Sequence, residues 1–188
     1  MRVVIDYFER MHDVITLGAD AHQIVDEPNA GGASVVSEAL SAEYMCRMFN
    51  ATGVVTEMQI PYFSPHWKKV DYLINIHNER VGVSVTRAMG YPSPGAFTVE
   101  DAERLCRKKL NGLVIARAGI VPTVGYCRSI LHCWCQTATI AHLMANAFEG
   151  FVEEADDDQR ASFDNIVVLL TVAEQTTHIF TENFGCLM

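Results

Sequence analysis

Apolar residues recur at helical spacing in two segments near the start of the chain, residues 3–17 and 34–50. A serine or threonine before a helix accepts a hydrogen bond from a free backbone N–H, so Ser34 or Ser37 is a candidate cap of the second helix. Gly53 is a plausible stop for that helix, because glycine adopts the conformations in which helices end. The sequence therefore predicts helices over both segments.

Three segments with strand periodicity follow, and they are residues 54–63, 70–78 and 81–88. In each, apolar side chains occupy every second position, which is typical of a strand with one buried face. The short connection of Asn78, Glu79 and Arg80 between the last two is typical of a hairpin. The pattern predicts a meander of three adjacent antiparallel strands.

The second half of the chain returns to longer elements. A loop rich in Pro and Gly spans 90–95, and Thr98 caps a predicted helix that runs to Leu110. After it we expect a short strand, a long helix and a final strand, over residues 113–116, 129–148 and 166–172. This order predicts an α/β (α+β) fold with a mixed central sheet, a three-strand meander and helices on both faces.

Length and composition limit the class of protein. With 188 residues, 49% of them hydrophobic and 20% charged, the chain suits one compact domain with a sizeable core. We divide it into an N-terminal helical extension, residues 1–33, and an α/β domain, residues 34–188. No long apolar run predicts a membrane span, and the first apolar stretch carries acids that a secretion signal lacks. We therefore expect an intracellular protein, in the cytoplasm or the nucleus.

The charge of the whole chain bears on its partners. A formal net charge of −9 argues against a protein that wraps duplex DNA through bulk positive charge. A local nucleic-acid site remains compatible with it, above all where bound metal ions supply positive charge. A protein partner or a homodimer is a further possibility, and a membrane is not expected.

Three short segments carry a resemblance to a known family. They are SEALSAE at 37–43, KKVDY at 68–72 and RVGVSVTR at 80–87. In their order and polar placements they resemble the PD-(D/E)xK nuclease superfamily, which has the restriction-endonuclease-like fold. In that family a helix with an acid precedes a three-strand meander, an aspartate begins the second strand, and the third strand carries an acid and a lysine. The resemblance covers 34–116, a little under half of the chain.

The resemblance implies a metal-dependent nuclease. Phosphodiester cleavage of this kind uses hard oxygen ligands for Mg²⁺ or Mn²⁺, and a lysine that stabilises developing charge. Asp71 corresponds to the strand aspartate, and either Glu43 or Glu38 to the helix acid. These three residues are the implied metal ligands.

The third strand departs from the family pattern. In one alignment Ser84 stands in the place of the acid and Thr86 in the place of the lysine. The Val-Thr-Arg sequence, which resembles viral cap-snatching endonucleases, allows a second alignment with Gly82 and Ser84 in those places. A lysine for the site then has to come from elsewhere. Lys109 lies near the middle of an otherwise apolar helix arc, and some family members place their lysine on this helix.

Aromatic and basic residues cluster before the second strand. Trp67, Lys68 and Lys69, together with Arg87 on the third strand, are candidate nucleic-acid contacts, since an aromatic ring stacks on a base and a cation binds phosphate. An ordinary loop anchored by its tryptophan is the other interpretation.

Two functions follow from these residues. The first is a Mg²⁺- or Mn²⁺-dependent nuclease, endo- or exonucleolytic, with Asp71, Glu43, Glu38, Ser84, Thr86 and Lys109 at its site. The second is an inactive relative that serves as a nucleic-acid-binding or protein-interaction scaffold. The missing strand acid and the net charge favour the second, and the position of Asp71 favours the first.

Overall fold

The computed structural model describes residues 1–8, 16–27 and 34–181. One six-stranded sheet, in the order β1-β6-β5-β4-β3-β2, forms the middle layer. Its strands are β1 Arg2–Tyr7, β2 Thr52–Thr56, β3 Tyr72–Ile76, β4 Glu79–Ala88, β5 Arg128–Cys135 and β6 Ile166–Val172. The main helices are α1 Ala19–Asp26, α2 Val35–Phe49, α3 Val99–Gly119, α4 Ala138–Glu154, α5 Asp157–Phe163 and α6 His178–Thr181.

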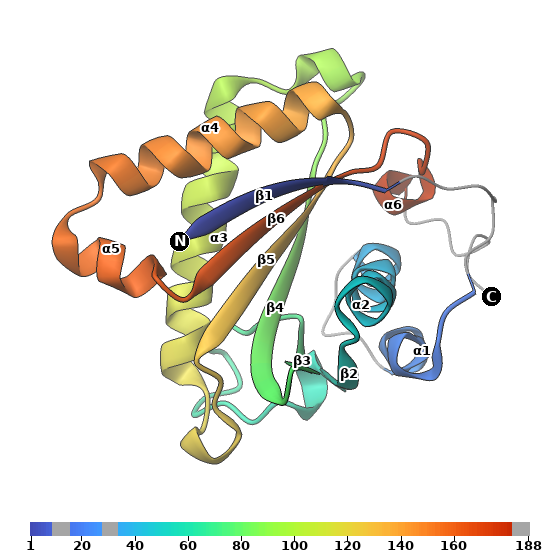
Figure 1. Cartoon of the computed structure of the whole chain (residues 1–188), viewed down its shortest axis with the longest axis vertical. Coiled ribbons are helices and arrows are strands. Elements are labelled where there is room, and N and C mark those ends of the chain that lie inside the picture. The colour runs from blue at the N-terminus through green and yellow to red at the C-terminus, as the bar shows by residue number, and fades with distance from the viewer. Residues whose placement is uncertain (9–15, 28–33, 182–188) are drawn as a thin grey trace.

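Helices cover both faces of the mixed sheet, as the sequence predicts (Figure 1). Helices α3 and α4 lie on one face, and α1 and α2 lie on the other. Each face has its own apolar cluster, one built with Leu110 and Leu113 of α3 and one with Leu40 and Met45 of α2. The described part of the chain contains no helix with the length and apolarity needed to cross a bilayer.

The predicted meander is confirmed. Strands β2, β3 and β4 are consecutive antiparallel neighbours. The connection between β3 and β4 is a tight turn at His77 and Asn78, whose φ angles of 49° and 64° are those of a type I′ hairpin. The first strand is shorter than predicted, because a 3₁₀ turn, Glu57–Gln59, follows Thr56.

Strand β5 replaces the first part of the long helix predicted over 129–148. It lies between β4 and β6 and is parallel to both. A strand in the centre of a parallel sheet is buried on both faces and reads as a continuous apolar run, which periodicity alone does not distinguish from a helix. Helix α4 then begins at Ala138, where the Thr137 side chain accepts a hydrogen bond from the N–H of Ile140 at 3.2 Å.

Helix α3 is longer than predicted. Thr98 caps it as expected, in a reciprocal capping box with Asp101. The helix does not stop at Gly112 but continues to Gly119, so the predicted strand over 113–116 is wrong. Leu113 and Ala116 are buried on the same side as Leu110, which extends the apolar arc of the helix by two turns.

The predicted helix over 3–17 is wrong at its start. Arg2–Tyr7 form β1, an edge strand parallel to β6. Its consecutive β-branched residues Val3, Val4 and Ile5 favour a strand, and the run is too short for periodicity to decide. The remainder of that predicted helix falls mostly on residues 9–15, and the loop predicted over 28–32 also lies outside the described residues.

A chain of buried polar side chains joins α2 to the sheet. The Ser41 hydroxyl lies 2.6 Å from the Tyr72 hydroxyl and 2.7 Å from His132 Nδ1. The other ring nitrogen, Nε2, lies 2.9 Å from the Thr171 hydroxyl. Satisfied polar groups in a low-dielectric core specify one arrangement of the elements that carry them. This chain therefore fixes α2 over strands β3, β5 and β6.

We expect the free energy of unfolding to fall as the pH falls below about 6.5. Burial lowers the pKa of His132 from 6.5 to about 3 in the folded chain. The unfolded chain therefore binds a proton between these values that the folded chain does not, and each pH unit in this window costs up to about 1.4 kcal/mol. Urea unfolding at about pH 7 and about pH 5 measures the slope.

Two asparagine variants separate His132 from the other titrating groups. His132→Asn loses this part of the slope, whereas His142→Asn, at an exposed position on α4, retains it. Equal slopes in the two variants would contradict the assignment.

Candidate functional site

Asp71 lies at the start of β3 with its carboxylate bound to β4. Its N–H donates to the carbonyl of Val83 at 2.9 Å, which continues the ladder beyond Tyr72. Its Oδ2 accepts hydrogen bonds from the Ser84 hydroxyl at 3.0 Å and from the N–H of Val85 at 2.5 Å. The aspartate and the serine are thus neighbours across two strands, and this places Ser84, rather than Gly82, beside Asp71.

Lys109 of α3 reaches the same place from above the sheet. Its Nζ donates to the carbonyl of Val85 at 2.8 Å. Burial lowers the pKa of Lys109, and the negative charge of Asp71 opposes that shift. A lysine on the helix therefore lies near the strand aspartate. The third strand itself has Thr86 in the position where the family has its lysine.

Glu57 is the second carboxylate of this region. Thr56, the last residue of β2, pairs with Tyr72, the first residue of β3. This register places Glu57 next to Asp71, one position outside the paired strands. Burial raises the pKa of Glu57, the charge of Asp71 raises it further, and Lys69 and Lys68 lower it. Glu57 is not among the implied ligands, because sequence periodicity shows only that it faces away from the apolar side of its strand.

These residues share the α3 face of the sheet. Side chains alternate along β4, so Ser84 and Thr86 point to the face opposite Val83 and Val85, which belong to the α2 cluster. We call Glu57, Asp71, Ser84 and Lys109 the carboxylate–lysine site. Thr86 is half-buried and follows Ser84 by two residues, on the same face of β4.

Glu43 serves the structure of the α2 side. Its Oε2 accepts a hydrogen bond from the N–H of Gly18 at 2.6 Å, and its Oε1 accepts one from Arg47 Nε at 2.5 Å. Arg47 also donates to the carbonyl of Thr16 at 2.8 Å. The buried carboxylate thus fastens the segment before α1 onto α2, and both of its oxygens already have donors.

Glu38 lies in the first turn of α2 and is half-buried. Its charge and that of Asp71 both contribute to raising the pKa of Tyr72, although burial is the main cause. Among the described residues, however, no three or more His, Cys, Asp and Glu side chains gather closely enough to hold a metal ion. Asp71, Glu38 and Glu43 therefore do not form a three-carboxylate site.

The aromatic and basic cluster packs partly against α3. Trp67 donates from Nε1 to the carbonyl of Ile115 at 2.8 Å, and its ring lies so close to Gly119 that a Cβ there would be 2.0 Å away. The stem of Lys68 passes Gly112 less closely, since a Cβ there would lie 3.3 Å from Lys68 Cε, and Lys69 Nζ lies 6.0 Å from the centre of the Tyr62 ring. The tryptophan thus anchors its loop, and the nucleic-acid role of these residues stays a prediction.

The carboxylate–lysine site fits a divalent cation only in part. Mg²⁺ commonly binds one or two protein carboxylates and completes its shell with water and substrate phosphate oxygens. Asp71 and Glu57 offer that number of carboxylates, and a bound cation would offset the repulsion between their negative charges. The residues present therefore fit a cation that shares its ligands with a bound phosphate.

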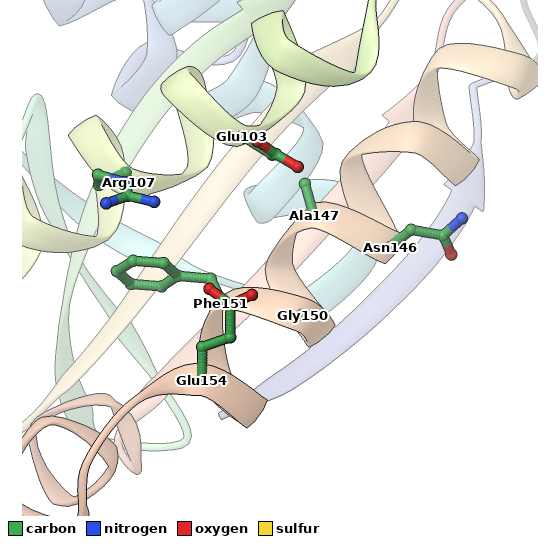
Figure 2. A pocket seen from close by; sticks show the side chains of 7 residues that line it. All are labelled: Glu103, Arg107, Asn146, Ala147, Gly150, Phe151 and Glu154. Carbon is green, nitrogen blue, oxygen red and sulfur yellow. The ribbon is translucent and has the colours of Figure 1, made fainter.

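A separate hollow of about 130 Å³ lies between α3 and α4 (Figure 2). Glu103 and Arg107 line it from α3, and Asn146, Phe151 and Glu154 line it from α4. The Arg107 guanidinium lies 5.5 Å from the centre of the Phe151 ring. The residues of this hollow are not those of the carboxylate–lysine site, and its stacked arginine joins the two helices.

Comparison with known proteins adds one relative. A protein of Dictyostelium discoideum named "AAC-rich mRNA clone AAC4 protein" is 32% identical over an alignment of 155 positions, which covers 78% of this chain and 22% of that protein. The chain thus spans less than a quarter of that relative, whose name states no activity. No protein-family model matches the chain, and no solved structure matches it.

We expect Glu43→Gln to destabilise the fold by about 1–3 kcal/mol without weakening metal binding, since the buried Glu43 carboxylate is the acceptor for the N–H of Gly18 and for Arg47, and a neutral amide accepts less well. Glu79→Gln is the matched control. It breaks only the exposed ion pair with Arg128, at 3.0 Å, and should cost about 0–1 kcal/mol.

Urea unfolding and Mn²⁺ calorimetry on both variants check this expectation. A loss of Mn²⁺ affinity in Glu43→Gln at unchanged stability would instead make Glu43 a metal ligand.

Proposed function

We propose that this chain is a nuclease-like domain that acts on nucleic-acid phosphodiesters with Mg²⁺ or Mn²⁺. The observation that carries the proposal is the convergence of Asp71, Ser84 and Lys109 on one face of the meander. This chemistry requires a carboxylate for the metal and a cation that stabilises developing charge. Here the start of a strand supplies the aspartate, and the following helix supplies the lysine.

The order of the elements supports the same proposal. Helix α2, the meander β2–β3–β4, helix α3 and strand β5 follow one another as in the restriction-endonuclease-like fold. Asp71 stands at the beginning of the second meander strand, as the aspartate of that family does. Lys109 would supply from the helix the lysine that the third strand lacks.

Each side chain has a defined part in this proposal. A bound divalent cation would activate water and neutralise charge on the phosphate. Asp71 and Glu57 would hold that cation, and the Ser84 hydroxyl and the N–H of Val85 keep the Asp71 carboxylate oriented. Lys109, held by the carbonyl of Val85, would place positive charge beside the phosphate.

The inactive relative is the second candidate, and a specific observation favours it. Ser84 occupies the place of an acid and binds Asp71, so a neutral hydroxyl replaces a metal ligand. Without that acid, metal binding depends on the raised-pKa Glu57. In this case the domain would bind nucleic acid or a protein partner, inside the cell, and would not cleave.

We expect Asp71→Asn to lower metal-dependent cleavage by about a hundredfold or more, because it removes the central carboxylate. Asparagine keeps an oxygen that can accept from Ser84 and Val85, so the fold should persist. Labelled single- and double-stranded DNA and RNA, incubated with Mn²⁺, Mg²⁺ or EDTA, provide the assay. Glu57→Gln and Lys109→Met should each lower the rate at unchanged fold, and Glu79→Gln is the unaffected control.

Two outcomes decide between the candidates. Cleavage that is lost with EDTA and in Asp71→Asn supports the nuclease. A wild-type chain that is inert on every substrate and shows no heat of Mn²⁺ binding would leave the scaffold as the function.

A further inference from the structure

A second hollow, of about 470 Å³, lies between the end of β4 and the first half of α3. We call it the basic hollow, and two cations and two aromatic rings set its chemistry: Tyr91, Phe97, Arg104 and Lys108. Arg87 also borders it, but its Nη1 donates to the carbonyl of Ile179 at 3.3 Å. Asp101 is the only acidic residue in its lining. The hollow is thus locally positive on a chain whose formal net charge is −9.

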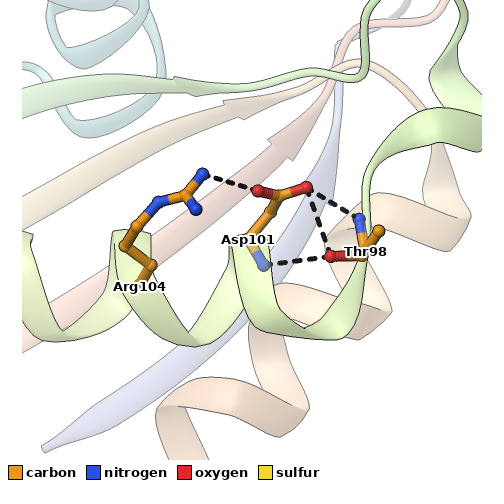
Figure 3. Close-up of polar contacts among 3 residues, drawn as sticks. All are labelled: Thr98, Asp101 and Arg104. Atoms are coloured by element: carbon orange, nitrogen blue, oxygen red, sulfur yellow. Dashed lines mark hydrogen bonds and ion pairs between the residues drawn. The ribbon is translucent and has the colours of Figure 1, made fainter.

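The one acid of the hollow is already engaged (Figure 3). Asp101 Oδ2 accepts from the backbone N–H of Thr98 at 3.1 Å, and Oδ1 accepts from Arg104 Nη2 at 2.5 Å. The capping box therefore holds Asp101 at the helix start, and Asp101 in turn holds the Arg104 guanidinium at the rim. Arg104 keeps 76% of its side chain exposed, so donors remain for a phosphate.

An exposed aromatic ring stands beside these cations. Tyr91 is 86% exposed, the largest exposure among the large hydrophobic side chains described. Its loop is fixed at the base, where the N–H of Gly90 donates to Gln136 Oε1 at 3.1 Å. Gly90 is also closely surrounded, since a Cβ there would lie 2.4 Å from the carbonyl oxygen of Ser93. The ring is therefore presented to solvent from an anchored loop.

The basic hollow adjoins the carboxylate–lysine site. Lys108 of the hollow and Lys109 of the site are consecutive on α3. The chain also runs along β4 from Val85, whose carbonyl binds Lys109, to Met89 and Gly90, which line the hollow. A ligand that occupied the hollow could therefore continue along β4 and α3 to Asp71.

From these observations we propose that the basic hollow binds single-stranded nucleic acid next to the carboxylate–lysine site. Arg104 and Lys108 contact phosphates, and Tyr91 stacks on a base. A base is free to stack on a side chain when it is not stacked within a duplex, and such contacts tolerate any sequence. The negative charge of the remaining surface disfavours a long duplex, whose many phosphates a small hollow does not neutralise. The inference rests on the proposed function for its substrate class.

The test measures binding apart from cleavage. In EDTA, and with Asp71→Asn as the parent, fluorescence anisotropy follows a labelled strand of about twelve thymidines, and a duplex of the same length serves for comparison. We expect tighter binding of the single strand. Tyr91→Ala should weaken it about five- to hundredfold, and Tyr91→Phe, which keeps the ring, should retain it.

The salt dependence tests the two cations. Arg104→Gln and Lys108→Gln should each weaken binding and lower the slope of log affinity against log salt by about 0.7. Arg128→Gln removes the same charge at the opposite end of the sheet, where β5 begins, and should leave both quantities unchanged. All these side chains are exposed or at a rim, so circular dichroism should show an unchanged fold.

Named outcomes separate this inference from the nuclease proposal. Equal affinity for strand and duplex, or unchanged affinity in Tyr91→Ala and in Arg104→Gln/Lys108→Gln, would overturn the hollow as the binding site. A further outcome is that free thymidine monophosphate displaces the labelled strand as effectively as the unlabelled strand does. That result would overturn the inference and identify the hollow as a nucleotide pocket. Hollow-dependent binding with no cleavage by the wild type supports the inference while the nuclease proposal fails.

Discussion

The register between β3 and β4 is the constraint on which the candidate site depends. Because Tyr72 pairs with Val83, the next position brings Asp71 beside Ser84, where Oδ2 accepts from both the serine hydroxyl and the N–H of Val85. The carbonyl of that same Val85 receives the Lys109 ammonium. A slip by one residue would turn Ser84 to the α2 face and separate all three groups. The type I′ turn at His77 and Asn78 holds this register, since its two-residue length leaves no freedom to slip.

Charge in this site is distributed differently from the pattern that the sequence resembles. The Ser84 hydroxyl stands at the strand position of an acid, the lysine near Asp71 belongs to α3, and the two carboxylates of this site are Asp71 and Glu57. Glu57 is partly desolvated, and its pKa is raised by burial and by Asp71. A cation near Glu57 and Asp71 would offset the effect of the Asp71 charge on Glu57, and Lys68 and Lys69 already supply part of that positive charge. The balance between these lysines and a divalent ion therefore decides whether the site binds metal.

The sequence predicts those features of the fold and of the site that depend only on residues close together in the chain. The meander follows from strand alternation and a short turn, Thr98 follows from capping chemistry, and Lys109 stands out because a cation interrupts an apolar arc. Two of the failures share one cause, which is that a short or fully buried apolar run has no distinctive period. The helices predicted over 3–17 and 129–148 both overlap strands at their start, β1 and β5. The strand predicted over 113–116 is a separate failure, because α3 continues past Gly112. The pairing of Glu57 with Asp71 depends on register between strands, which no single segment encodes.

The two faces of the sheet carry polar groups for different purposes. On the α2 face, His132, Ser41 and Tyr72 are wholly enclosed and satisfy one another, so no substrate reaches them even though a serine and a histidine lie 2.7 Å apart. Burial keeps that imidazole neutral, which suits a fixed contact between helix and sheet. On the α3 face, Asp71 and Lys109 are only partly buried, and Lys108, the neighbour of Lys109 on α3, lines the basic hollow. Since chemistry requires access as well as the right atoms, the α3 face is the one on which the proposed reaction would take place.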